Sequence, residues 1–341
     1  MIKKYIKKYG LPVVIVGILG KITSIILVFG VFGHWFGTLL PSESEHITIY
    51  LDPERTLQEH QLTIEEEVSK HGGHGERLTR VLYWRGWSEQ IVPGKYEINA
   101  GETIGDVAHK FATGDRESVS VIVPAGRDLE VIAGKIAQNI AADSLAVLQF
   151  IRPDSIRWQI IPNTYEMWWE TTAEEALLRL KKERVIWWNT ERQEKAKGKD
   201  LSAEEAVILA SIVQAETSNI SEAPIVAGLY LNRLKSGQAL QADPTLIYAW
   251  DDISITRVLN KHKEIDSPYN TYMHAGLPPG TIRTPEPTYI DAVLNATEHD
   301  YLYMCAEPGG TGKHVFERRY RDHLRNARKY QKWLNKQNIY R

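Results

Sequence analysis

A long apolar segment near the N-terminus places the strongest constraint on what this chain can fold into. From Leu11 to Leu40 the sequence is apolar apart from Lys21, His34 and a few small or hydroxyl residues. As a helix, residues 22–40 would span about 28 Å, which is close to the thickness of the hydrocarbon layer of a bilayer. We therefore predict a transmembrane helix over residues 22–40, preceded by a basic cytoplasmic segment over residues 1–21.

The charges on either side of this segment predict its orientation. Lysines precede it at positions 3, 4, 7 and 8, and the acidic sequence SESEH follows it at residues 42–46. Because basic residues accumulate on the cytoplasmic side of membrane helices, we expect the N-terminus in the cytoplasm and the body outside. A cleaved signal peptide is the alternative, but it favours a shorter apolar run and a small-x-small site, which residues 37–44 do not offer.

Composition limits the functions open to the body. The formal net charge of −2 argues against a surface that binds nucleic acids or other polyanions. Cys305 is the only cysteine, so an intramolecular disulfide is impossible and a zinc-thiolate site is not expected. His71 and His74 lie in a glycine-rich loop without an obvious third ligand, and a solvated loop is the better interpretation. We therefore expect neither a metal site nor a cofactor.

Residues 42–160 have the pattern of an α+β module. Short β-branched segments such as residues 119–123 alternate with amphipathic segments such as residues 128–140. No group of residues with catalytic spacing occurs in this region. Two interpretations stay open, a spacer and a polysaccharide-binding module.

The most informative stretch lies between residues 201 and 248. Ser202 and Glu205 form a capping box, which starts a helix. Leu209 and Ile212 lie on one face of that helix, and one turn later the same face carries Glu216. A carboxyl that ends a core-facing stripe should either be paired or have a raised pKa, and a raised pKa is what a general acid requires. The alternative from spacing alone is a frayed last turn, with the carboxylate in water.

Residues 161–341 are predicted to form a mixed α/β domain with this carboxyl near the end of a helix. The segment 267–285 is a long loop rich in Pro, Gly, Asn and Tyr, and loops of this length in compact domains are usually functional or disordered. The string GTGK at residues 310–313 does not fit a phosphate-binding loop, because His314 stands where a Ser or Thr is required.

Several strings in this chain, in the same order, resemble the YceG-like family of endolytic murein transglycosylases. They extend over roughly residues 90–325 and include PNTYE, LASIVQAET, VAGLYLNRLKSGQALQADPTLIY, SPYNTYMHAGLPPGTI and GKHVF. The resemblance implies a single-pass inner-membrane enzyme that faces the cell wall, with a LysM-like element in the membrane-proximal half. It also implies cleavage of the MurNAc–GlcNAc bond of nascent glycan strands, which leaves 1,6-anhydro-MurNAc ends and terminates elongation. Peptidoglycan synthases are expected partners.

The family's catalytic glutamate corresponds to Glu216. Family members commonly carry a second acid where this chain has Gln214, so a single candidate remains here. Asn163 and Thr281 also depart from the family pattern, without removing a group that the chemistry needs. Apolar surroundings should raise the pKa of Glu216 from ~4.3 towards roughly 6, so that one residue could act first as acid and then as base.

An oxocarbenium-like transition state also needs polar partners. The motif-rich stretches offer six candidates for substrate binding, each of which could equally have a structural role: Gln241, Asp243, Tyr248, Asn270, Tyr272 and His314. Asp243 could serve as a second carboxylate, although an Asp-Pro pair typically forms a turn. The alternative to an enzyme is a membrane-anchored, peptidoglycan-binding scaffold without catalysis.

Overall fold

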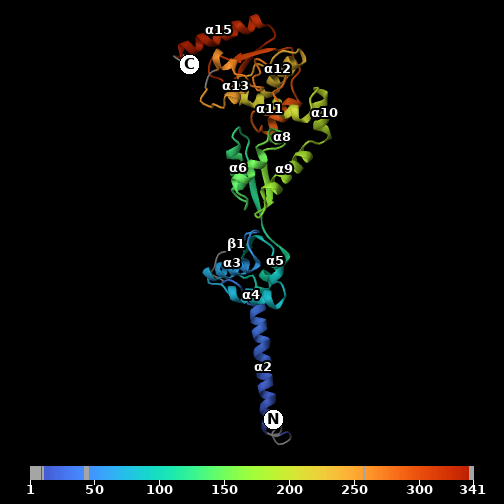
Figure 1. Ribbon diagram of the computed structural model, residues 1–341, viewed down its shortest axis with the longest axis vertical. Coiled ribbons are helices and arrows are strands. Elements are labelled where there is room, and N and C mark those ends of the chain that lie inside the picture. Colours follow the sequence, from blue (N-terminus) through green and yellow to red (C-terminus); the bar gives the residue numbers. More distant parts are fainter. Residues whose placement is uncertain (1–8, 10, 42–45, 256–257, 338–341) are drawn as a thin grey trace. The chain divides into compact units, whose positions relative to one another are not determined.

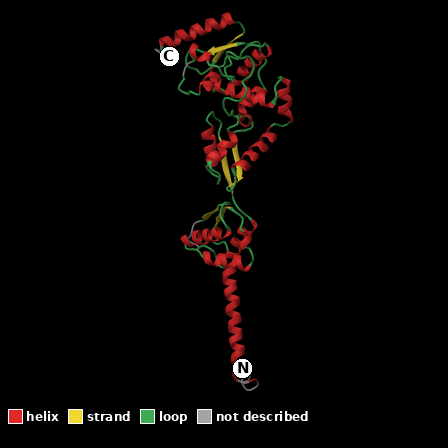
Figure 2. Ribbon diagram, in the orientation of Figure 1, coloured by secondary structure: helices red, strands yellow, loops and turns green. Residues whose placement is uncertain are grey.

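The computed structural model of this chain describes residues 9, 11–41, 46–255 and 258–337, and it is a mixed α+β protein (Figure 1). Helices predominate, and the strands form small two-stranded sheets (Figure 2). The chain divides into two compact units. The first comprises Met1–Val119 and Glu166–Thr171, and the second comprises Ser120–Tyr165 and Thr172–Arg341. The functional division that the sequence suggests near residue 160 stays a prediction.

The predicted transmembrane segment is wrong at its C-terminal boundary. Helix α2 covers Leu11–Phe36, and the chain then leaves the helix. Thr38 forms an isolated bridge with Thr103, and Leu39 and Leu40 are buried in the core of the first unit, so these residues belong to that core. Among the described residues, no helix combines the length and the apolar character needed to cross a membrane. Most of the flanking charges, at residues 1–8 and 42–45, lie outside the described part of the chain.

The first unit is built around a short antiparallel sheet. Ile49 pairs with Tyr96 at the centre of this sheet, and both side chains are buried. Helix α3 begins at a capping box between Thr56 and Glu59, a signal that is local in sequence. The elements of this unit are β1 (Ile47–Leu51), α3 (Leu57–Lys70), α4 (Gly75–Trp84), η1 (Ser88–Gln90), β2 (Gly94–Ile98) and α5 (Ile104–Thr113).

The middle of the chain confirms the predicted strand and helix near residues 119–140. Strand β3 covers Ser118–Val123 and pairs with β4 (Asn163–Trp168). The Asp128 side chain caps the next helix by accepting hydrogen bonds from the backbone amides of Glu130 and Val131. The helices of this region are α6 (Leu129–Ala137), α7 (Ser144–Ile151), α8 (Asp154–Arg157), α9 (Ala173–Trp187) and α10 (Thr190–Gly198).

Helix α11 (Ala203–Glu216) is the centre of the second unit. Every residue from Ala206 to Val213 is buried, so the helix has no solvent-facing side along these two turns. Helices α12, α13 and α14 pack around it. The predicted apolar stripe is therefore only part of its buried surface. The remaining elements are α12 (Ala223–Lys235), α13 (Asp243–Trp250), η2 (Asn260–Glu264), α14 (Pro287–Leu294), β5 (Tyr303–Ala306), β6 (His314–Glu317) and α15 (Tyr320–Lys336).

Candidate active site

The end of α11 carries Glu216 in an ordered last turn. The helix starts at the predicted capping box, in which the Ser202 hydroxyl accepts a hydrogen bond from the Glu205 amide. At the other end, the Thr217 amide donates to the Val213 carbonyl oxygen at 3.1 Å. The last turn is therefore intact, and the alternative of a frayed helix end is excluded.

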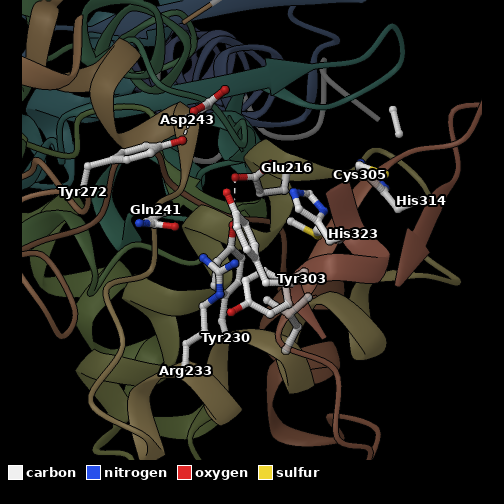
Figure 3. Close-up of a pocket in the computed structure, with 14 residues that line it drawn as sticks. Glu216, Tyr230, Arg233, Gln241, Asp243, Tyr272, Tyr303, Cys305, His314 and His323 are labelled. Carbon is white, nitrogen blue, oxygen red and sulfur yellow. Dashed lines mark hydrogen bonds between the residues drawn. The ribbon is translucent and has the colours of Figure 1, made fainter. Parts of the chain in front are cut away.

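Glu216 lines a cavity of about 330 Å³ in the second unit (Figure 3). Its walls come from α11, α12, the start of α13, the loop around Tyr272, both strands of the β5–β6 hairpin and the start of α15. The polar residues that line it are Glu216, Tyr230, Arg233, Gln241, Asp243, Tyr272, Tyr303, Cys305, His314, Tyr320 and His323. A carboxyl group at the end of a buried helix thus lies among side chains from distant parts of the sequence.

The surroundings of Glu216 favour its protonated form. Burial raises the pKa of Glu216 to about 7, and the nearby Asp243 charge acts in the same direction. The Tyr230 hydroxyl donates a hydrogen bond to Glu216 Oε1 at 2.8 Å, and this bond and the Arg233 charge lower the pKa. The direction predicted from the helix face is confirmed. A carboxyl with this pKa exists in both protonation states near neutral pH, which suits a residue that must give and take a proton.

Two residues of α12 support this carboxyl. Burial and the adjacent Glu216 raise the pKa of Tyr230 well above its usual value, so its hydroxyl stays protonated and remains a donor. Arg233 is buried, and its Nε donates to the Leu302 carbonyl oxygen at 2.7 Å. Its Nη1 donates to the Leu240 carbonyl oxygen at 2.5 Å. Arg233 thereby joins α12 to two segments that border the cavity.

Asp243 and Tyr272 form a second polar group in the cavity. Asp243 is the first residue of α13, and its Oδ1 accepts a hydrogen bond from the Tyr272 hydroxyl at 2.5 Å. Gln241 has a φ of 50°, in the left-handed region, and its amide donates to the Thr271 carbonyl oxygen at 2.9 Å. This bond fastens the turn before α13 to the loop that carries Tyr272, and so places both groups at one wall.

His314 is held by a buried glutamate. Glu222 precedes α12, and its Oε1 accepts a hydrogen bond from the His314 amide at 2.9 Å. Its Oε2 lies 3.1 Å from Nδ1 of the same histidine. A carboxylate at Nδ1 favours the tautomer that carries its proton there, which leaves Nε2 as an acceptor. Glu222 is not among the residues predicted from the sequence, where its signal is a lone acid immediately before the first turn of α12.

Two of the predicted binding residues do not line the cavity. The Tyr248 hydroxyl accepts a hydrogen bond from Arg157 Nη1 at 2.9 Å, and its ring packs on Tyr269 at 4.7 Å between ring centroids. Asn270 is fully buried, and its Nδ2 donates to two backbone carbonyl oxygens, while Oδ1 accepts from the Tyr272 amide at 3.0 Å. Asn270 therefore braces the loop that positions Tyr272.

The remaining predicted residues, Gln241, Asp243, Tyr272 and His314, meet around Glu216. Sequence reasoning missed Tyr230, Arg233 and Glu222. Tyr230 and Arg233 are three positions apart on α12, so they share a helix face, and that spacing was the available signal. Within the described residues, no group of three or more His, Cys, Asp or Glu side chains could hold a metal ion.

Comparisons with known proteins agree with the resemblance in the sequence. A model of the YceG-like family matches residues 55–329. The endolytic murein transglycosylase of Bacillus subtilis strain 168 is 28% identical over 264 residues, covering 70% of this chain and 72% of that protein. The endolytic murein transglycosylase of Streptococcus pneumoniae strain R6 is 24% identical over 351 residues, covering 87% of this chain and 62% of that protein. This chain thus spans less than two thirds of the pneumococcal protein.

A solved structure of a yceG-like protein from Listeria monocytogenes also matches. It has a TM-score of 0.49 and 21% sequence identity, and the match covers 83% of this chain and 99% of that one.

Proposed function

This chain belongs to the YceG-like family, and from that premise we propose that it is an endolytic peptidoglycan lytic transglycosylase. It cleaves the MurNAc–GlcNAc bond within nascent glycan strands and leaves 1,6-anhydro-MurNAc ends, which terminates elongation. The observation that carries this proposal is the carboxyl of Glu216, with a pKa of about 7, in a polar cavity of about 330 Å³.

In the first step, protonated Glu216 acts as the general acid. It donates its proton to the glycosidic oxygen while the bond from that oxygen to C1 of MurNAc breaks, and the GlcNAc leaves as an alcohol. The Tyr230 hydroxyl already occupies Oε1, so Oε2 is the atom that carries the proton. The same hydrogen bond stabilises the carboxylate as it forms.

In the second step, the Glu216 carboxylate acts as the general base. It accepts the proton of the MurNAc 6-hydroxyl while that oxygen bonds to C1 and closes the anhydro ring. The proton taken from the 6-hydroxyl replaces the one that Glu216 gave to the departing GlcNAc, so the enzyme is regenerated without water. A single carboxyl is therefore sufficient for this reaction, whereas ordinary glycosidases use two.

Positive charge develops at C1 between these steps, and Asp243 is the second acid in the cavity. Its charge already acts on Glu216, so it lies within electrostatic reach of the reacting atoms. We assign to Asp243 the stabilisation of the oxocarbenium-like transition state, and to Gln241 and Tyr272 the orientation of the sugar. His314, held by Glu222, contributes an acceptor for a sugar hydroxyl.

Product analysis tests the proposal. Purified glycan strands are digested with the wild-type protein, with Glu216→Gln and with Glu264→Gln, which changes an exposed acid that does not line the cavity. Mass spectrometry should find 1,6-anhydro ends with the wild type and with Glu264→Gln, and almost none with Glu216→Gln. Reducing MurNAc ends would exclude the lyase mechanism and indicate a hydrolase. Strands that bind but stay intact with the wild type would favour the non-catalytic scaffold.

We further propose that the protein acts on the cell-wall side of the membrane, where peptidoglycan synthases are its partners. The support for a membrane-attached protein with a cytoplasmic N-terminus is the group of lysines before the apolar N-terminal segment. None of the described helices is long and apolar enough to cross a membrane. The first unit is proposed as a LysM-like, glycan-holding module, because its two-stranded sheet and helices carry exposed Tyr50, Tyr83 and Trp84, which could stack on sugars.

A further inference from the structure

A second cavity lies on the other side of the last turn of α11. It has a volume of about 470 Å³ and shares no lining residue with the cavity of Glu216. Gln214 lines this second cavity, and it precedes Glu216 by two positions, which is about 200° around a helix. The polar residues that line it are Gln214, Ser218, Arg283, Glu286, Thr288 and Tyr289.

Arg283 is the unusual member of this group. Its side chain is half-buried, and no hydrogen bond or ion pair joins it to another described residue. The Nε atom is fully buried without a partner. Burial lowers the pKa of Arg283, although a guanidinium still keeps its charge at neutral pH. A partly buried charge without an ion-pair partner carries a desolvation cost, and an anionic ligand would reduce that cost.

The neighbours of Arg283 are mostly hydrogen-bond donors. Gln214 Oε1 accepts from the Glu286 amide at 2.9 Å, so the amide nitrogen of Gln214 remains as a donor. Among the described residues, the hydroxyls of Ser218 and Thr288 have no hydrogen-bond partner and can turn towards a ligand. Such a set suits a carboxylate, which accepts several hydrogen bonds and pairs with the fork of an arginine.

Glu286 is the acidic residue that lines this cavity, and its carboxylate would repel an anionic ligand. It is exposed, so water screens its charge, and it lies near enough to Arg283 to favour the guanidinium without forming an ion pair. Tyr289 is engaged elsewhere, since its hydroxyl donates to the Thr217 carbonyl oxygen at 3.1 Å. This bond ties the wall of the cavity to the residue that follows Glu216.

We propose that this cavity binds a carboxylate of the stem peptide on the glycan strand, with Arg283 as the anchoring residue. The proposal rests on the proposed function, because a murein strand carries peptides with free carboxylates on its MurNAc residues. The distance is within reach: an extended peptide covers about 3.3–3.6 Å per residue, so three or four residues pass a helix about 10–12 Å wide. A sugar at Glu216 can therefore place its stem across the end of α11.

The test compares strands with and without stem peptides, the latter prepared by enzymatic removal of the peptide from MurNAc. Arg283→Gln should raise KM on stem-bearing strands by roughly tenfold, with kcat nearly unchanged, because a charge-assisted hydrogen bond is lost in substrate binding. On stripped strands the variant should match the wild type. Glu264→Gln, which changes an exposed acid that lines neither cavity, should leave KM unchanged on both substrates. An equal loss with Arg283→Gln on both substrates would overturn the proposal.

A binding measurement separates this proposal from the proposed function. Glu216→Gln protein is titrated with a stem-bearing glycan fragment and with its stripped counterpart, alone and combined with Arg283→Gln. The stem should strengthen binding by roughly tenfold only when Arg283 is present. Equal affinities for the two fragments would refute the carboxylate site even if the enzyme yields anhydro ends. If the protein binds the stem-bearing fragment more tightly but yields no anhydro ends, only the proposed lyase chemistry is refuted. Arg283→Lys, which keeps the charge, replaces Arg283→Gln if that variant unfolds.

Discussion

Replacing Glu216 by Gln should stabilise the protein at alkaline pH and leave its stability unchanged at acid pH. The folded state holds this proton with a pKa of about 7, against an ordinary value of 4.5. Between these two values the unfolded chain releases the proton and the folded protein keeps it, so wild-type stability falls as the pH rises through this window. This difference between the two pKa values lowers the free energy of unfolding of the wild type by about 3 kcal/mol above pH 8. Gln does not titrate, and its amide oxygen can still accept the Tyr230 hydrogen bond.

Urea unfolding at pH 4, 6 and 8 measures this effect, with the exposed Glu264→Gln as the control. The difference in the free energy of unfolding between Glu216→Gln and the wild type should be near zero at pH 4. It should grow at pH 6 and reach about 3 kcal/mol at pH 8. The control should show no such growth. If the difference for Glu216→Gln were the same at pH 4 and pH 8, the reasoning that burial raises this pKa would be refuted.

Two further substitutions test the surroundings of α12, and a third, in α6, serves as a control. Tyr230→Phe removes a hydrogen bond that lowers the pKa of Glu216, so this pKa should rise by about one unit. The alkaline limb of the pH–rate profile should move to higher pH by the same amount. An unchanged alkaline limb would contradict this role of Tyr230. In Gly228→Ala the new Cβ would lie 2.3 Å from the Thr297 carbonyl oxygen, so urea unfolding should show a loss of roughly 1–3 kcal/mol. Gly134→Ala meets nothing within 4 Å and should instead gain up to about 1 kcal/mol; equal effects would rule out the clash.

Features that depend on neighbours along the chain could be read from the sequence. The capping box at Ser202 involves residues three positions apart, so a short string contains the whole interaction. The direction of the pKa shift of Glu216 followed from its spacing to Leu209 and Ile212 on one helix. That part of the prediction is confirmed, because helix geometry fixes which residues share a face whatever surrounds them.

Other features depend on which elements pack together, and no local pattern reports that. The residues at 37–40 read as a continuation of an apolar helix, but Leu39 and Leu40 are buried in the core of the first unit. Tyr248 and Asn270 lie in family-like motifs, as Tyr272 does, yet these two residues do not line the cavity.

The sequence by itself determined the α+β class and the helix that ends in Glu216, since these follow from composition and periodicity. It also determined the family, through strings that resemble that family in the same order. Only the tertiary structure decided what surrounds that carboxyl. Tyr230 reaches it from the next helix, Asp243 from the start of α13, and His314 from a hairpin nearly a hundred residues away. Long-range packing brings these groups together, and the pKa of Glu216 depends on the charge and burial that they supply.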